Sequence, residues 1–398
     1  FWMRRISVLS NQVVIIMVYL DNAATSFPKP QQVGTAVARF IHETGANPGR
    51  SGHKLSMEAA EAVYACRKAV ASCFHAPGAE CVSFTLNATY AINFALKGAL
   101  AGRGSSAHVV TSNLEHNAVM RPLYALQRPY TAAVVDLADD ACTLRNFEAS
   151  LRPDTALVAC THASNLCGRV LPIAEIGALC HERGIPFLVD ASQSAGMVPI
   201  DMQASHIDFL CLPGHKSLYG PMGTGILIAA HGETLATLIE GGTGSNSVDF
   251  AQPDLMPDRF ESGTVNAPGI VGLHAGVRFV RARGQESYVK EMRLARMLYD
   301  GLRRIPGIRL YTPRPWGNGY VPVVSFNIGS RSSVEVTSRL DKMGFALRGG
   351  LHCAPAAHMA FGTIDQGMVR ASMGAFNTPD HIAALLSAVK MLAEEKEP

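Results

Sequence analysis

Two residues of this sequence combine a reactive side chain with a position at the end of an apolar run. Lys216 follows FLCLPGH in a loop rich in glycine and proline, and Asp190 ends the run GIPFLVD. In parallel α/β sheets, ligands collect at the carboxyl ends of strands, so both side chains could enter a cleft. A partly desolvated lysine there can form a Schiff base, whereas a solvated loop lysine is the plainer interpretation. A phosphate-binding P-loop is excluded because the Gly-Lys-Ser/Thr triplet is absent.

An acid that follows wholly apolar residues is costly to bury without a cationic partner. For Asp190 that partner could be a metal, an arginine or the protonated ring nitrogen of pyridoxal phosphate. Gln193 stands three residues further on and could reach the same ligand. The alternative is that Asp190 only caps a helix or a turn.

A third candidate element is the segment FTLNATYAINFALKGAL, in which a strand runs through Asn87 and Thr89 into an apolar helix. Free amides and the dipole at such a helix start bind phosphate, although both residues could simply cap the helix. His116 follows another strand, in SNLEHNAV. Its imidazole could stack on a flat cofactor ring or be a structural histidine.

The nine cysteines include no C-x-x-C pair, and most lie in apolar stretches. A disulfide framework is not expected in a chain of this length, so we expect a reducing, cytoplasmic location. Cys353 differs because it lies in the polar, glycine-rich segment RGGLHCAP. It is either a reactive thiol or a structural cysteine in a loop. A zinc site formed by His352, Cys353 and His358 lacks a fourth ligand, so no metal is predicted.

Longer motifs extend this pattern along the chain. They are YLDNAATS at 19–26, NATYAIN at 87–93, EHNA at 115–118, VDASQSAG at 189–196, GHK with YGPMGTG at 214–225, RFESGTVNAPG at 259–269, RGGLHCAP at 348–355 and VRASMGAFNT at 369–378. Together they resemble the class V aminotransferase group. Within it, the sequence is most similar to the cysteine desulfurase/selenocysteine lyase family, from about Val18 to the C-terminus.

The resemblance implies an aspartate-aminotransferase-like fold with pyridoxal 5'-phosphate as cofactor. In such a fold Lys216 would be the Schiff-base lysine, and Asp190 would pair with the ring nitrogen. The other residues that the resemblance assigns to the cofactor are Gln193 near the ring hydroxyl, His116 over the ring, Thr89 and His215 at the phosphate, and Ala88. Thr264 matches a threonine that reaches the neighbouring subunit's cofactor, which implies a homodimer.

The resemblance also implies a substrate site and a reaction. The matching substrate-binding residues are Asn165, Arg370, Asn22 and Ala24. Cys353 falls where the family keeps its sulfur-accepting cysteine. We therefore expect conversion of L-cysteine, or a similar small amino acid, to L-alanine, with sulfur held as a persulfide and passed to an acceptor protein. Two departures stand out: Pro213 replaces a common serine, and Leu351 replaces a histidine of the better-known branch.

Three other functions stay open at this point. A selenocysteine lyase or another C–S lyase could use the same site without Cys353. A class V aminotransferase acting on alanine, serine or glyoxylate is a second alternative. The third is a degenerate protein of the same fold that serves as a binding scaffold, which only Pro213 favours.

The elements that must position these residues follow from hydrophobic periodicity. Short β-branched runs predict strands at 81–85, 108–111, 133–136, 157–161, 187–189, 209–212 and 225–228. Helical stretches between them are predicted at 58–73, 91–100, 118–126 and 173–183. This alternation indicates parallel β-α units around a sheet covered on both faces. After about residue 268 the pattern changes to helices at 270–303, 334–343 and 379–396 and a strand at 321–328.

The 398 residues therefore indicate a large α/β domain followed by a smaller α+β domain. The predicted division is 1–16 as a tag or non-native extension, 17–32 as a segment packing with the small domain, 33–270 as the large cofactor-binding domain, and 271–398 as the small domain carrying Cys353 and Arg370. The net charge of +3 gives no basic field for nucleic acid. The longest apolar run, 13–20, is far below the roughly 20 residues of a membrane helix.

Overall fold

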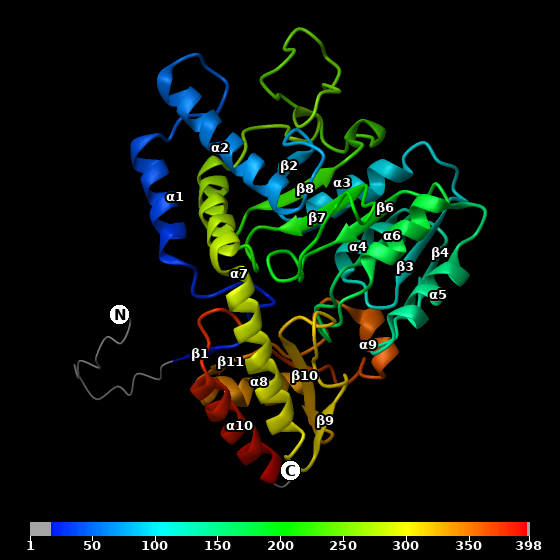
Figure 1. Ribbon diagram of the computed structural model, residues 1–398, viewed down its shortest axis with the longest axis vertical. Coiled ribbons are helices and arrows are strands. Elements are labelled where there is room, and N and C mark those ends of the chain that lie inside the picture. Colours follow the sequence, from blue (N-terminus) through cyan, green and yellow to red (C-terminus); the bar gives the residue numbers. More distant parts are fainter. Residues whose placement is uncertain (1–16, 396–398) are drawn as a thin grey trace.

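The computed structural model describes residues 17–395, so the predicted extension at 1–16 lies outside the described residues. A seven-stranded sheet dominates the larger part of the molecule (Figure 1), in the order β2-β8-β7-β6-β5-β3-β4. Its strands are β2 (Val82–Thr85), β3 (His108–Ser112), β4 (Tyr130–Ala133), β5 (Thr155–Thr161), β6 (Phe187–Asp190), β7 (Phe209–Pro213) and β8 (Gly225–Ala229). Strand β8 runs antiparallel to the other six.

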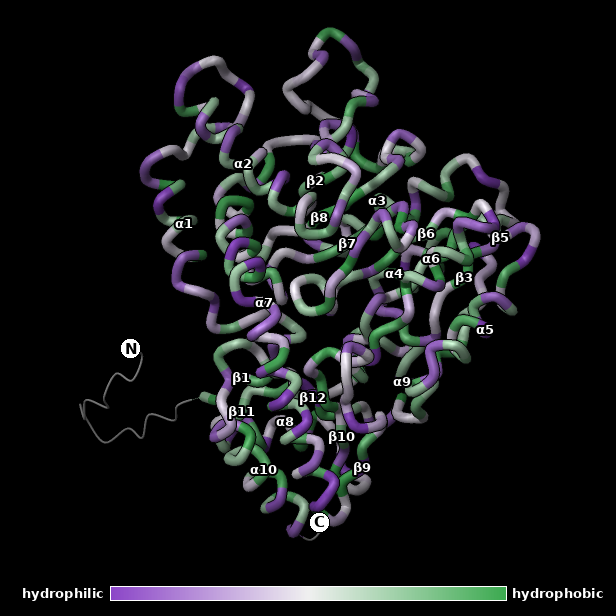
Figure 2. The backbone as a smooth tube through the Cα atoms, in the orientation of Figure 1, coloured by the Kyte–Doolittle hydropathy of each residue, from purple (hydrophilic) through white to green (hydrophobic). Residues whose placement is uncertain are grey.

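Helices cover both faces of this sheet, because alternate strand residues are apolar on each side. The helices are α1 (Gln31–Glu43), α2 (Lys54–Cys73), α3 (Ala88–Leu100), α4 (Asn117–Ala125), α5 (Asp140–Ser150) and α6 (Ile173–Glu182). One core joins α2 and α6 to residues such as Val158 and Val189, and the other joins α3 and α4 to Leu157 and Leu188. The central strands are largely green, or hydrophobic, in Figure 2. The result is a three-layer α/β/α arrangement.

The smaller part has its own core and two small sheets. Strands β9 (Ile308–Leu310), β10 (Val323–Ile328) and β12 (Val369–Ser372) form an antiparallel sheet, and β1 (Val18–Tyr19) pairs in parallel with β11 (Phe345–Ala346). The helices are α8 (Ser333–Lys342), α9 (Pro355–Phe361) and α10 (Pro379–Glu394). Helix α7 (Ala267–Leu302) runs from the large part into the small one (Figure 1), and its two ends belong to different cores.

The α/β fold class is confirmed, and so are six of the seven strands predicted for the large part. The strand predicted at 133–136 is wrong, because Tyr130–Ala133 pairs with β3 instead. The sheet is mainly parallel, as expected, and β8 runs antiparallel between β2 and β7. Among the described residues, no helix is both long and apolar enough to cross a membrane.

Candidate active site

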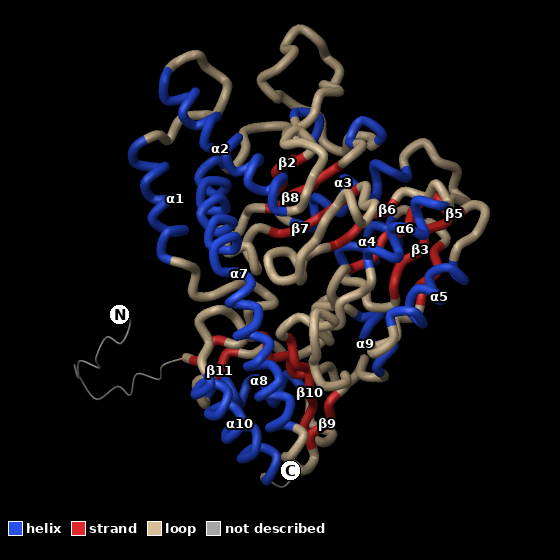
Figure 3. Tube along the Cα trace, viewed as in Figure 1, coloured by secondary structure: helices blue, strands red, loops and turns tan. Residues whose placement is uncertain are grey.

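A cavity of about 220 Å³ opens where the two parts meet, at the carboxyl ends of the parallel strands. Figure 3 shows loops gathered between the large sheet and the small part. The predicted residues that line the cavity are Lys216, Asp190, Gln193, His116, Ala88, Thr89, His215, Asn165, Arg370 and Ala24. Because the N-terminal segment and the small part meet the strand ends here, residues as far apart in the sequence as Ala24 and Arg370 line the same cavity.

Asp190 and Lys216 enter the cavity from neighbouring strands. Asp190 ends β6 with 2% of its surface exposed, and its Oδ1 accepts the Ser192 amide at 2.9 Å. It forms no ion pair with any residue that the structure describes. Burial lowers the pKa of the Lys216 amine to about 8, although the Asp190 charge acts in the opposite direction. Near physiological pH a minor fraction of the amine is therefore in its neutral, nucleophilic form, far more than for an ordinary lysine.

The peptide that carries Lys216 is fastened by the N-terminal segment. The carbonyl oxygen of His215 accepts hydrogen bonds from Thr25 Oγ1 at 3.1 Å, Ser26 Oγ at 3.2 Å, the Ser26 amide at 3.3 Å and Lys29 Nζ at 2.9 Å. The same segment receives Gln193, whose Nε2 donates to the Ala23 carbonyl at 3.0 Å. Gln193 and the peptide between His215 and Lys216 are thus attached to a segment that begins in the small part.

His116 and Glu115 stand at the start of α4. His116 caps this helix, since its Nδ1 accepts the Ala118 amide at 3.0 Å. Burial lowers the pKa of His116 to about 4, so the imidazole is neutral at physiological pH. Glu115 lies behind it, fully buried, and its Oε1 accepts the Thr161 amide at 2.9 Å. Burial raises the pKa of Glu115 to about 8.

The start of α3 forms another wall of the cavity. Asn87 caps the helix by accepting the Tyr90 amide at 3.2 Å, and Ala88 and Thr89 follow it along the cavity. A helix start of this kind favours an anion. Pro213 also lines the cavity and offers neither a hydroxyl nor an N–H group. Burial lowers the pKa of His215 to about 4, so this imidazole can donate a hydrogen bond without carrying charge.

Arg370 and Asn165 form the side of the cavity that faces the small part. Arg370 lies on β12 with 1% of its surface exposed, and its Nη1 donates to the Asn165 carbonyl at 2.9 Å. Its Nη2 pairs with Asp21 Oδ1 at 2.7 Å. The Asn165 side chain donates to the His352 carbonyl at 2.8 Å, which links this wall to the Cys353 loop.

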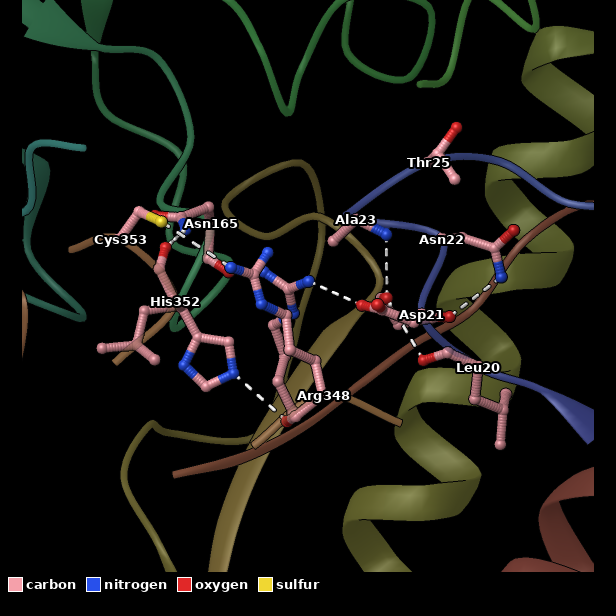
Figure 4. Close-up of polar contacts among 12 residues, drawn as sticks. Leu20, Asp21, Asn22, Ala23, Thr25, Asn165, Arg348, His352 and Cys353 are labelled. Carbon is pink, nitrogen blue, oxygen red and sulfur yellow. Dashed lines mark hydrogen bonds and ion pairs between the residues drawn. The ribbon is translucent and has the colours of Figure 1, made fainter. Parts of the chain in front are cut away.

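Cys353 is exposed and does not line the cavity itself. Its Sγ accepts a hydrogen bond from Arg348 Nη2 at 3.7 Å, and Arg348 does line the cavity. The Cys353 carbonyl accepts the Asn117 amide at 2.7 Å. His352 and Cys353 both have positive φ values, of 52° and 56°, which turn the loop sharply. Figure 4 shows this loop and the segment from Leu20 to Thr25 on opposite sides of the site.

Besides Cys353, two predicted residues do not line the cavity, Thr264 and Asn22. Thr264 is exposed and accepts a hydrogen bond from Asn47 Nδ2 at 3.4 Å. Asn22 Nδ2 donates to the Ser372 carbonyl at 3.0 Å and so supports the backbone beside the site. Sequence reasoning missed Asp21 and Lys29 as parts of the site, although both stand in or beside the YLDNAATS motif.

No set of three or more histidine, cysteine or acidic side chains within residues 17–395 is placed to hold a metal ion. The family model "Aminotransferase class-V" matches residues 18–385, so the chain belongs to the class V aminotransferase family.

Individual relatives narrow this class further. A "Probable cysteine desulfurase" of Xylella fastidiosa is 36% identical over 390 residues, covering 94% of this chain and 92% of the relative. The apo structure of a cysteine desulfurase from Thermococcus onnurineus superposes with a TM-score of 0.88 at 29% identity, covering 95% of each chain. A cysteine desulfurase structure from Escherichia coli gives 0.84 at 26% identity, with 95% of each chain covered. The protein belongs to the cysteine desulfurase family.

Proposed function

We propose that this protein converts L-cysteine to L-alanine with pyridoxal 5'-phosphate and receives the sulfur on Cys353 as a persulfide. The observation that carries the proposal is the arrangement of Cys353 and Lys216. The exposed thiol contacts Arg348, and Arg348 shares one cavity with Lys216 and Asp190. Family membership supports both the cofactor and the substrate.

The residues in the cavity fit this cofactor. The buried, otherwise unpaired Asp190 suits a cationic ring nitrogen, and the neutral His116 suits a stacking role. The start of α3, with Thr89 and His215 nearby, suits the phosphate, and its donors compensate for the missing hydroxyl at Pro213. When bound, pyridoxal phosphate supplies an electron sink for the substrate's α-carbon.

The chain's own groups then have defined tasks. Arg370 holds the substrate carboxylate, a task that its fixed fork of N–H donors suits. Lys216 takes the proton from Cα and carries it within the cavity, because its lowered pKa lets the amine act as a base near neutral pH. Asn165 positions Arg370 through its carbonyl and the Cys353 loop through its side chain.

Sulfur transfer is assigned to Cys353. Its thiolate attacks the substrate sulfur, and an S–S bond forms as the Cβ–S bond breaks. The carbon keeps the electron pair of the broken bond and takes a proton, so the organic product is alanine. The guanidinium of Arg348 stabilises the thiolate that this attack requires.

Two further parts of the proposal concern partners. We place Thr264 in the neighbouring subunit's site, because it is exposed and does not line its own cavity. The protein would then act as a homodimer with shared sites. The exposed position of Cys353 would allow the persulfide to meet an acceptor protein.

Incubation with L-cysteine, L-selenocysteine and L-alanine separately tests the proposal. We expect alanine from L-cysteine and a mass increase of one sulfur atom on the Cys353 peptide. The Cys353→Ser variant should lose both, whereas the matched Cys142→Ser variant, altered at a half-buried cysteine of α5, should keep both. Sulfide release that persists in Cys353→Ser would favour a C–S lyase and refute the persulfide step. Preferential turnover of L-selenocysteine would indicate a selenocysteine lyase.

A further inference from the structure

Arg370 has one carboxylate partner among the residues that the structure describes, and that partner is Asp21. The pair joins Nη2 to Oδ1 at 2.7 Å, with the arginine side chain 1% exposed and the aspartate side chain 20% exposed. The two residues lie 349 positions apart in the sequence. A guanidinium buried to this extent is costly without a counter-charge, so Asp21 stabilises it in the absence of substrate.

The guanidinium retains unused hydrogen-bonding capacity. Of its five N–H donors, one on Nη1 goes to the Asn165 carbonyl and one on Nη2 goes to Asp21. The buried Nε has no partner. Because Arg370 lines the cavity, the second N–H groups of Nη1 and Nη2 are left for a second carboxylate without displacement of the first.

The backbone fixes Asp21 opposite Arg370. Asp21 forms a parallel bridge with Ser372, two residues beyond Arg370 on β12. On either side of Asp21, the Ser372 amide donates to the Leu20 carbonyl at 2.7 Å, and Ser372 Oγ accepts the Ala23 amide at 2.9 Å. Figure 4 shows Asp21 between these neighbours, directed into the site. The separation of the two charges is therefore set by the sheet and not by a flexible loop.

We propose that Asp21 is a positioning residue that orients Arg370 and limits its affinity for the substrate carboxylate. It compensates the guanidinium while the site is empty, and it stays in place when the substrate carboxylate binds to the remaining donors. Two carboxylates then share one guanidinium, so their repulsion weakens substrate binding. This inference rests on the proposed role of Arg370 as the substrate carboxylate ligand.

Propionate is a suitable probe because it carries a carboxylate but no amine that could react with the cofactor. In Asp21→Asn the hydrogen-bond acceptor remains and the negative charge is lost. We expect the holoenzyme variant to bind propionate at least about fivefold more tightly by calorimetry, because the repulsion between two close carboxylates is gone. The KM for L-cysteine should fall by a similar factor. In contrast, kcat should fall because an amide orients the guanidinium less firmly than a carboxylate.

Two controls separate charge from structure. Asp140→Asn removes the partner of Arg169, another buried arginine with an exposed aspartate outside the cavity, and should leave propionate affinity unchanged. Asp21→Glu keeps the charge, so its propionate affinity should stay within about twofold of the unsubstituted protein. This variant also keeps the inference testable if Asp21→Asn does not fold, since a tightening of fivefold in Asp21→Glu would contradict it.

Arg370→Gln distinguishes failure of the inference from failure of the proposed function. If propionate binds Arg370→Gln as tightly as the unsubstituted protein, the role of Arg370 in carboxylate binding is wrong. If Arg370→Gln abolishes binding while Asp21→Asn leaves it unchanged or weaker, the role of Arg370 stands and the inference about Asp21 is overturned.

Discussion

Burial moves the titratable side chains around Lys216 toward their uncharged forms. The pKa values of His116 and His215 fall to about 4, that of Lys216 falls to about 8, and that of Glu115 rises to about 8. Desolvation disfavours the charged form of acids and bases alike, which explains the opposite directions of these shifts. Near neutral pH both imidazoles are therefore uncharged, and Lys216 and Glu115 lie close enough to their pKa values to change charge.

The lowered pKa of Lys216 predicts how fast this amine captures pyridoxal phosphate. Only the neutral amine attacks the aldehyde, so the capture rate should rise about tenfold per pH unit below pH 8 and level off above it. Borohydride trapping followed by peptide mass measures attachment at Lys216. The Lys216→Arg variant is the control and should show none. A rate that still climbs steeply beyond pH 9 would contradict the lowered pKa.

Glu115 predicts a pH dependence of stability. Burial raises its pKa from 4.5 to about 8, so the folded state keeps a proton that the unfolded state has released in this range. The contribution of Glu115 to stability is full below pH 4.5 and is lost as the pH rises toward 8. Glu115→Gln should therefore flatten the fall in the free energy of unfolding over this window by roughly 2–4 kcal/mol. Urea unfolding at pH 5 and pH 8 measures the free energy of unfolding of both proteins. An equal loss of that free energy between the two pH values in Glu115→Gln and in the unsubstituted protein would refute the prediction.

Single residues of the site could be predicted where the chain itself marks them. Asp190 ends an apolar strand and Lys216 closely follows the next one, and both residues line the same cavity. Asp21 carries no such local signal, because its ion pair with Arg370 depends on a bridge between strands from opposite ends of the chain. The spacing of residues along the sequence does not encode that contact.

At the scale of elements, helix starts shape the cavity as much as strand ends do. Helix α3 begins at Ala88 beside the cavity, and Asn87 caps it. Helix α4 begins beside His116, which caps it in turn. Each cap stabilises the start of a helix, and the positive end of each helix dipole lies at the site.

Replacing the α3 cap should weaken both stability and cofactor binding. In Asn87→Ala the Tyr90 amide loses its acceptor, at a cost of about 1 kcal/mol in the free energy of unfolding. Because the helix start then frays beside the proposed phosphate site, the Kd for pyridoxal phosphate should rise several-fold. Fluorescence titration of the cofactor-free protein measures this Kd.

Asp139 provides a matched control for Asn87. It caps α5 by accepting the Cys142 amide at 3.1 Å and does not line the cavity. Asp139→Ala should cost similar stability and leave the Kd for the cofactor unchanged. If both variants change the Kd equally, the effect of Asn87 is a general loss of stability.

The helices that sequence analysis missed bury few residues. Helix α1 buries only Val33 and Phe40, and α5 buries only Thr143 and Phe147. The prediction of a strand at 133–136 rests on the most apolar run in this region, whereas the edge strand β4 begins at an exposed tyrosine. Pairing with β3 sets the position of β4, and the local sequence does not encode such a tertiary interaction.

At the scale of the molecule, α7 connects the two cores. Its first half contributes Leu273 to the core under the large sheet, and its second half contributes Leu298 to the core of the small part. The segment from Tyr19 to Lys29 makes a second connection through the His215 carbonyl and Arg370. The cavity lies between these two connections.

We therefore expect one cooperative unfolding transition. Leu273→Ala and Leu298→Ala each remove a fully buried side chain and should each cost about 3 kcal/mol in the free energy of unfolding. Because one continuous helix joins the cores, both variants should shift the same calorimetric peak. The exposed Val289→Ala variant on the same helix should shift it little. Two resolved peaks, each moved by only one leucine variant, would show that the cores unfold separately.

The crowded carbonyl of His215 has a mechanical consequence. A peptide group is planar, so holding its oxygen also holds the amide nitrogen and the Cα atom of Lys216. Four donors on that oxygen restrain the backbone at Lys216, so only the bonds of the Lys216 side chain remain free to rotate. The reactive amine therefore moves only through the side-chain torsions of Lys216, about a backbone whose position is fixed. The entropy cost of fixing that backbone is met when the chain folds and does not recur at each turnover.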